Sequence, residues 1–491
     1  MSENAKRQKA SRVDEGGEAA VDRISDLPDS LLLHILSFLE AHELVKTSLL
    51  SKRWKSLWAS ATTLSFDSGL KRWKKPLYFV TFVNSFLMLH EGQKIRRFHA
   101  RLDSKNVQHV YIDCWFHFLK RRAVEEIDLH FSDSWSLPRR SIERERYVIC
   151  NSLFDCKVLK ALTLTGCILD PAACFCFMFL ENLELNDVLI PKLDLSCCPL
   201  LKCLNMMHCN QYDTLDIHAP NLKFRSFMLT DSFRARDTKL VLYAPNISFI
   251  KLLGSLRQQY DVRDLSSLKK ASFFVDTSRD INRFFGIFKT FGHAQTFALS
   301  NSCLEGLANA VMKNLDTPSL TIEALEVDSD LSKFGIWIIA HALKSFPHVD
   351  SLIFKVCMKW DYCAEPLFED FVKRKLTWKS LEEPFVSVAT HIKNITIIDF
   401  LLANARKNNE KYEYGEPMSD KMEFSRLVKN ENLEPVKLFL KFCTMLKKMD
   451  IKIAYIEYIH ESPLKSDFFS SLSKRVQNLP RSSKHAQISV S

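Results

Sequence analysis

Residues 22–60 read DRISDLPDSLLLHILSFLEAHELVKTSLLSKRWKSLWAS, and their apolar pattern predicts three short helices. Pro28 suits the first turn of a helix, and Ser25 or Asp26 is the expected cap. The first helix carries one apolar stripe, made of Leu31, Leu32, Ile35, Leu36 and Leu39. About forty residues bury too little surface to fold alone. We therefore expect part of this apolar surface to contact another polypeptide.

The same segment resembles an F-box, the helical module that joins a protein to the Skp-type adaptor of a cullin ubiquitin ligase. The family's opening Leu-Pro matches Leu27 and Pro28, and its closing Ser-x-Arg-Trp matches Ser51, Arg53 and Trp54, with Leu50 where the family usually has Val. The resemblance implies ten residues for adaptor docking and helix packing together: Leu27, Pro28, Leu31, Leu32, Ile35, Leu36, Leu39, Ser51, Arg53 and Trp54. The sequence does not separate the two roles.

Beyond this segment, a Leu-x-x-Leu-x-Leu phrase recurs with the spacing of a leucine-rich repeat, about 21–23 residues from one copy to the next. Its leading positions are Leu159, Leu180, Leu201, Phe224, Ile247 and Leu268. Each phrase places three apolar residues on one face of a short strand, which only stacked neighbours can bury. The spacing therefore predicts an irregular α/β solenoid with a curved parallel sheet.

Five further phrases strengthen a resemblance to plant F-box/LRR-repeat proteins. CPLL at 198–201, APNL at 219–222 and APNI at 244–247 are similar to linking phrases of that family. EPVKLFL at 434–440 and FCTMLKKM at 442–449 are similar to its FBD-type C-terminal region.

These patterns divide the chain into six expected segments. They are a disordered basic tail at 1–21, an F-box at 22–62, a helical linker at 63–120, leucine-rich repeats at 121–360, divergent repeats with an FBD-like region at 361–473, and a disordered tail at 474–491.

Composition sets limits on the environment and the partners. The chain has 491 residues, of which 46% are apolar. It shows neither a secretory leader nor an apolar window of about 20 residues, the length that a membrane-spanning helix needs. We therefore expect no membrane insertion, a location in the cytoplasm, the nucleus or both, and 14 free thiols. The net charge of +10 lies in scattered clusters, which argues against a nucleic-acid partner.

The sequence also argues against catalysis and metal binding. It contains no nucleophile elbow, no glycine-rich phosphate loop and no His-Glu-x-x-His, so no catalytic residue and no cofactor are expected. The densest set of potential zinc ligands is Cys174, Cys176, Cys197, Cys198, Cys203, His208 and Cys209, and the spacing of the set as a whole argues against a structural zinc site. Cys167 and Cys209 instead occupy the inward-turning slot of a repeat, where a small thiol packs.

The resemblance implies a substrate-recognition subunit of a Skp/cullin/F-box ubiquitin ligase. The F-box would bind the adaptor and, through it, a cullin, and the repeats would bind an unknown protein target. Two alternatives remain at this point: an F-box scaffold that serves no ligase, and a basic nucleic-acid-binding repeat protein.

Overall fold

The computed structural model describes residues 24–491 with gaps. The gaps are 25–26, 70–72, 74, 104–106, 133–145, 150–152, 154–155, 170–174, 191, 210–213, 222, 232–238, 278–280, 318–319, 330, 357–376, 401–432 and 453–463. The expected tail at 1–21 therefore lies outside the described residues.

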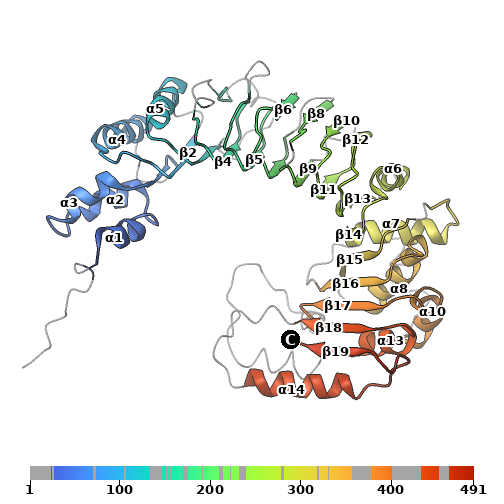
Figure 1. Ribbon diagram of the computed structural model, residues 1–491. Coiled ribbons are helices and arrows are strands. Elements are labelled where there is room, and N and C mark those ends of the chain that lie inside the picture. The colour runs from blue at the N-terminus through green and yellow to red at the C-terminus, as the bar shows by residue number, and fades with distance from the viewer. Residues whose placement is uncertain are drawn as a thin grey trace, which may run out of the picture.

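The described parts form an arc around one large parallel sheet (Figure 1). Within those parts it has 15 strands in chain order: β1 (Thr63–Asp67), β2 (Arg97–Asp103), β3 (Glu126–Ser132), β4 (Ala161–Thr165), β5 (Asn182–Asn186), β7 (Cys203–Met207), β9 (Ser226–Asp231), β11 (Phe249–Ser255), β13 (Lys270–Asp276), β14 (Thr296–Leu299), β15 (Ala324–Ser329), β16 (Ser351–Val356), β17 (Asn394–Ile398), β18 (Lys448–Lys452) and β19 (Gln487–Val490). A second parallel sheet runs in the order β12 (Gln259–Arg263), β10 (Lys239–Tyr243), β8 (Thr214–His218) and β6 (Lys192–Asp194).

Helices begin the chain and line the outer side of the arc (Figure 1). The N-terminal group is α1 (Asp29–Leu36), α2 (Ala41–Thr47), α3 (Trp54–Leu57) and the 3₁₀ turn η1 (Trp58–Ser60). The outer elements are α4 (Pro76–Leu89), α5 (His109–Arg121), α6 (Ile281–Phe291), α7 (Asn301–Met312), α8 (Lys333–Ala342), η5 (Leu343–Ser345), η6 (Lys379–Leu381), α10 (Glu382–Ala389) and α13 (Glu434–Phe442). The last helix, α14 (Leu464–Gln477), lies beside the final strand at the C-terminal end of the arc (Figure 1). The predicted α/β solenoid with a curved parallel sheet is confirmed.

Strict alternation along the strands builds the core. In β4, Leu162 and Leu164 are buried in the core, and Thr163 between them lies on the opposite face of the strand. In-register pairing stacks Leu162 on Leu183 of β5 and continues the same contact along the sheet. All six leading repeat positions are buried: Leu159, Leu180, Leu201, Phe224, Ile247 and Leu268. The repeat spacing therefore located the core-facing residues correctly.

The segment at 63–120 differs from the expected helical linker. It contributes β1 and β2 to the sheet, with α4 and α5 as their return segments, so the solenoid begins at Thr63. The physical reason is visible in the strands, where Leu64 and Phe66 alternate with polar residues and pair with Phe98 and Ala100. Two strongly apolar helices obscured this alternation in the sequence.

The C-terminal end also differs from expectation. Residues 474–491, expected to be a disordered tail, contain the end of α14 and the strand β19, which pairs in parallel with β18. Ile488 and Val490 pack against the core, so this strand covers the last open edge. In the region expected to hold divergent repeats, β17 and β18 continue the sheet and α13 packs beside α10.

Candidate adaptor-docking surface

The first helix starts one residue later than the sequence suggested. Pro28 is the residue before the helix, with φ −60° and ψ 149°, and Asp29 opens α1. The carbonyl of Pro28 accepts hydrogen bonds from the backbone N–H of Leu31 at 3.0 Å and of Leu32 at 3.1 Å. The expected caps, Ser25 and Asp26, lie outside the described residues. Proline thus fixes the backbone at the entry to α1.

The apolar stripe of α1 divides into two faces. Leu32 and Leu36 are fully buried, whereas Leu31 is 49% exposed and Ile35 is 43% exposed. Leu31 and Ile35 are four residues apart, so they form a continuous outward row. Leu27 and Leu39 lie between these extremes, partly buried against the core. The structure therefore separates packing residues from residues that are open to a partner.

Arg53 ties the end of the segment to its beginning. Its Nε donates to Asp29 Oδ1 at 2.9 Å, and its Nη2 donates to the carbonyl of Leu27 at 2.6 Å and also contacts Asp29. Trp54 follows and is buried, and its N–H approaches Ser51 Oγ at 3.5 Å. Ser51 is exposed. This clamp joins the entry of α1 to α3, so Arg53 supports the shape of the outward row and Trp54 anchors it.

Other apolar side chains of the F-box are also exposed. Ile24, Phe38, Leu49 and Leu50 are all more than half exposed. Sequence reasoning did not select them, although Phe38 lies at helical spacing from Leu31 and Ile35 and could have been found on that ground. We define the F-box face as Ile24, Leu31, Ile35, Phe38, Leu49 and Leu50. So many exposed apolar side chains in one short domain are typical of a protein contact site.

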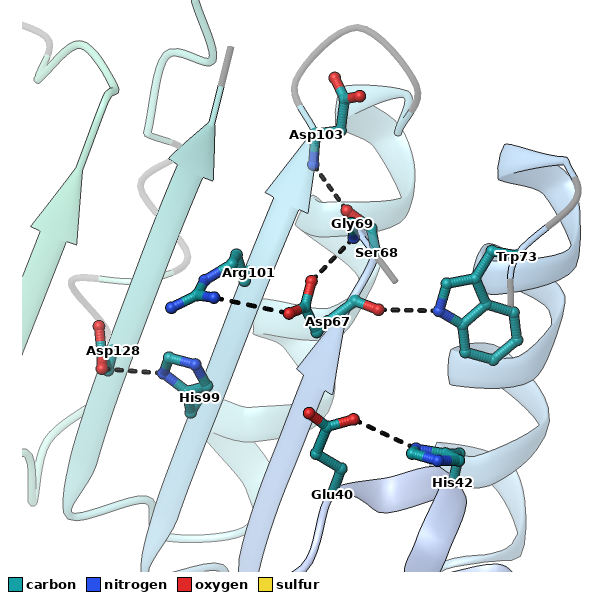
Figure 2. Close-up of polar contacts among 10 residues, drawn as sticks. All are labelled: Glu40, His42, Asp67, Ser68, Gly69, Trp73, His99, Arg101, Asp103 and Asp128. Atoms are coloured by element: carbon teal, nitrogen blue, oxygen red, sulfur yellow. Dashed lines mark hydrogen bonds and ion pairs between the residues drawn. The ribbon is translucent and has the colours of Figure 1, made fainter. Parts of the chain in front are cut away.

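The F-box meets the first strand of the arc across a small pocket, and polar contacts hold the strand side of that pocket together (Figure 2). Trp73 Nε1 donates to the carbonyl of Asp67 at 2.8 Å, and the Asp67 carboxylate accepts the N–H of Gly69 at 2.8 Å. Next to it, Arg101 Nη1 lies 3.6 Å from Asp67 Oδ2. A small pocket separates these groups from the start of α2, where His42 Nδ1 lies 3.2 Å from Glu40 Oε2.

A buried histidine completes the junction. His90 Nε2 lies 2.9 Å from the carbonyl of Ala61, and Arg122 binds the carbonyls of His90 at 3.2 Å and Gly92 at 2.6 Å. Burial lowers the pKa of His90 below its usual value, and the nearby charge of Arg122 adds to this, against the raising effect of the Ala61 hydrogen bond. The imidazole is therefore neutral and holds the end of the F-box against the arc.

The inner face of the sheet presents a row of three apolar side chains and one threonine near its middle. Met207 pairs with Thr230, Thr230 with Leu253, and Leu253 with Phe274, and all four are partly exposed. The Lys251 ammonium lies 4.8 Å from the centre of the Phe274 ring. This central row combines apolar area with one cation, which suits contact with a protein side chain.

The buried cysteines act as packing groups. Cys209 Sγ donates to the carbonyls of Leu185 at 3.0 Å and Met207 at 3.4 Å, and burial raises its pKa to about 12. Burial also raises the pKa of Cys167 well above its usual range. Both thiols are therefore protonated and buried in the core. The candidate Cys174 lies outside the described residues, and the described remainder holds no cluster of three metal-ligating side chains.

No helix in the described part of the chain has both the length and the apolar character to cross a bilayer.

Comparison with known proteins identifies the family. The F-box domain model matches residues 24–64, and the model described as "At1g61320/AtMIF1, LRR domain" matches residues 86–405. In Arabidopsis thaliana, the putative F-box/LRR-repeat protein At3g18150 is 27% identical over 346 residues, covering 68% of this chain and 72% of that protein. The F-box/FBD/LRR-repeat protein At1g13570 is 31% identical over 213 residues, covering 41% and 48%. This chain therefore belongs to the plant F-box/LRR-repeat proteins, with an LRR domain of the At1g61320/AtMIF1 family.

Proposed function

We propose that this chain is the substrate-recognition subunit of a Skp/cullin/F-box ubiquitin ligase, acting in the cytoplasm or nucleus. The outward row of Leu31 and Ile35 carries the proposal, because the F-box keeps these side chains exposed while Leu32 and Leu36 complete its core. An adaptor groove that covered the F-box face would remove six large apolar side chains from water, which favours association. Pro28 and Ser51, which are also exposed, lie within the proposed contact.

The proposed target surface is the inner face of the arc. Its central row begins at Met207 of β7, five strand spacings from β1, and ends at Phe274 of β13, eight strand spacings from β1. The row therefore lies roughly 24–38 Å from β1 along the sheet. The rigid junction at Asp67 and His90 fixes this distance, because the sheet is continuous between the two ends. A bound target would thus be held at a defined place relative to the adaptor.

The mechanism is proximity. A target held beside the ubiquitin donor of the ligase reacts as if its concentration were raised, without a catalytic group from this chain. Affinity for the target and affinity for the adaptor are carried by separate surfaces, so each can be removed alone.

Affinity capture from plant cells under proteasome inhibition tests the proposal. The Leu31→Ser/Ile35→Ser variant should lose the adaptor and cullin and should keep a target that accumulates with the inhibitor. Leu315→Ser/Met445→Ser is the matched control, because it removes two exposed apolar side chains far from the F-box. Capture of adaptor and cullin with no accumulating target would favour a scaffold, and salt-sensitive capture of nucleic acid would favour the third alternative.

A further inference from the structure

Helix α4 has an unusual surface. Its sequence, PLYFVTFVNSFLML, contains no charged residue, although only one side of the helix is buried. Leu77, Tyr78, Met88 and Leu89 are 61%, 52%, 86% and 60% exposed. They form one pair at each end of the helix, with the exposed Thr81 and Ser85 between them on the same side, and together they present on the order of 400 Å² of apolar surface. The described residues show nothing that covers it.

One edge of this patch lies toward the F-box. A helix turns about 100° per residue, which puts Leu89 beside Phe86, three residues earlier, and Tyr78 beside Phe82, four residues later. The Phe86 ring packs against the Trp58 ring of η1, with 5.1 Å between the centroids. Phe82, on the same side, lines the small pocket that His42 of α2 also lines. Tyr78 and Leu89 therefore border the F-box.

The other edge lies toward α5. Leu77 and Met88 fall beside Asn84 around the helix, and Asn84 Oδ1 accepts a hydrogen bond from Trp115 Nε1 of α5 at 2.8 Å. The two edges carry the same kind of side chain but face different neighbours. This arrangement provides a matched pair of variants within one helix.

The F-box face and the first edge are parts of one body. Helix α1 packs against α3 and η1, and η1 in turn contacts Phe86 of α4. Just after α4, the N–H groups of Glu91 and Gly92 donate to the carbonyl of Ala59 at 2.8 Å and 3.1 Å. Figure 1 shows α4 beside α2 and α3 at the N-terminal end of the arc.

We infer that the Skp-type adaptor contacts Tyr78 and Leu89 of α4 in addition to the F-box face. This inference rests on the proposed function and extends its binding surface into the first repeat. A stable interface covers about 800 Å² on each partner, and two further large side chains next to η1 bring the apolar area closer to that size. The contact with α4 also sets the direction in which the arc leaves the adaptor, since α4 belongs to the first repeat.

The adaptor affinity of the full-length chain tests this inference, measured by surface plasmon resonance on purified recombinant adaptor. Tyr78→Ser/Leu89→Ser should weaken binding about tenfold, mainly through faster dissociation. The control Leu77→Ser/Met88→Ser, on the α5 edge, should change the affinity less than twofold. All four side chains are exposed, so the melting temperature of both variants should stay within a degree or two of the wild type.

The possible results distinguish a failure of the α4 contact from a failure of adaptor binding as a whole. Equal affinities for the two double variants, or a larger loss for the α5-edge control, would overturn the inference. If Leu31→Ser/Ile35→Ser loses binding in the same experiment, the proposed function stands without the α4 contact. A folded wild-type chain that does not bind the adaptor would overturn both.

Discussion

Two neighbouring residues of α1, Ile35 and Leu36, should respond oppositely to substitution by alanine. Leu36 is fully buried, and removal of a buried leucine side chain costs about 2–5 kcal/mol of stability. Ile35 is 43% exposed, so its exposed part is still available for a partner. Complete burial of an isoleucine is worth about 1.5–3 kcal/mol. Burial of the exposed 43% of the Ile35 side chain by the adaptor then contributes about 0.6–1.3 kcal/mol to binding, which corresponds to a threefold to ninefold change in Kd.

Two assays separate these effects. Amide hydrogen exchange in α1 reports the local free energy of opening, which Leu36→Ala should lower by about 2–5 kcal/mol. Ile35→Ala should change that free energy by less than about 1 kcal/mol and should weaken binding in a calorimetric titration with the adaptor. If Ile35→Ala destabilised α1 as much as Leu36→Ala, or left the Kd unchanged, the division of α1 into two faces would be wrong.

Three further predictions concern the arc and its junction. The buried Asp231 carboxylate accepts hydrogen bonds from Arg257 Nε at 2.6 Å and Nη2 at 2.7 Å. Asp231→Ala leaves the Arg257 charge buried without its partner, so the free energy of unfolding measured in urea titrations should fall by about 3–5 kcal/mol. Asp231→Ala/Arg257→Met removes that charge as well and should recover most of the lost free energy. Gly166 has φ +74°, and an added Cβ would lie 2.2 Å from the Phe131 carbonyl, so Gly166→Ala should lower the melting temperature by several degrees; an unchanged value would contradict this reading. Because burial lowers the pKa of His90, the unfolded chain takes up protons first as pH falls below about 6.5, and stability should drop there. His90→Gln should lessen this pH dependence in unfolding measured between pH 7.5 and 5.5; an equal slope in both proteins would exclude His90 as a cause.

The repeats could be predicted from the sequence because spacing alone fixes them. A buried apolar residue about every 21–23 residues requires one turn of the solenoid per interval. The buried positions from Leu159 to Leu268 follow from it. The strands at the two ends escaped prediction for a different reason. β1 and β19 each supply only two side chains to the core, such as Leu64 and Phe66 of β1. A pair of apolar residues with this spacing occurs by chance in any apolar segment.

The candidate site could be predicted only in part. The motif located the F-box, and the helical period placed five apolar residues on one stripe of α1. That stripe is wider than the contact α1 makes with the rest of the F-box. Whether Leu32 or Leu31 turns inward depends on where α3 and η1 pack, and the local sequence of α1 does not contain that information. The exposed row on α4 has the same origin, because only tertiary contacts decide which side of an uncharged helix stays open.

Calorimetric titration of the purified full-length chain with a Skp-type adaptor tests the central claim most directly. We expect a 1:1 complex with a Kd of about 1 μM or tighter, and at least a tenfold weaker Kd for Leu31→Ser/Ile35→Ser with an unchanged melting temperature. A properly folded wild-type chain that shows no binding at this concentration, or binding that Leu31→Ser/Ile35→Ser leaves intact, would contradict it.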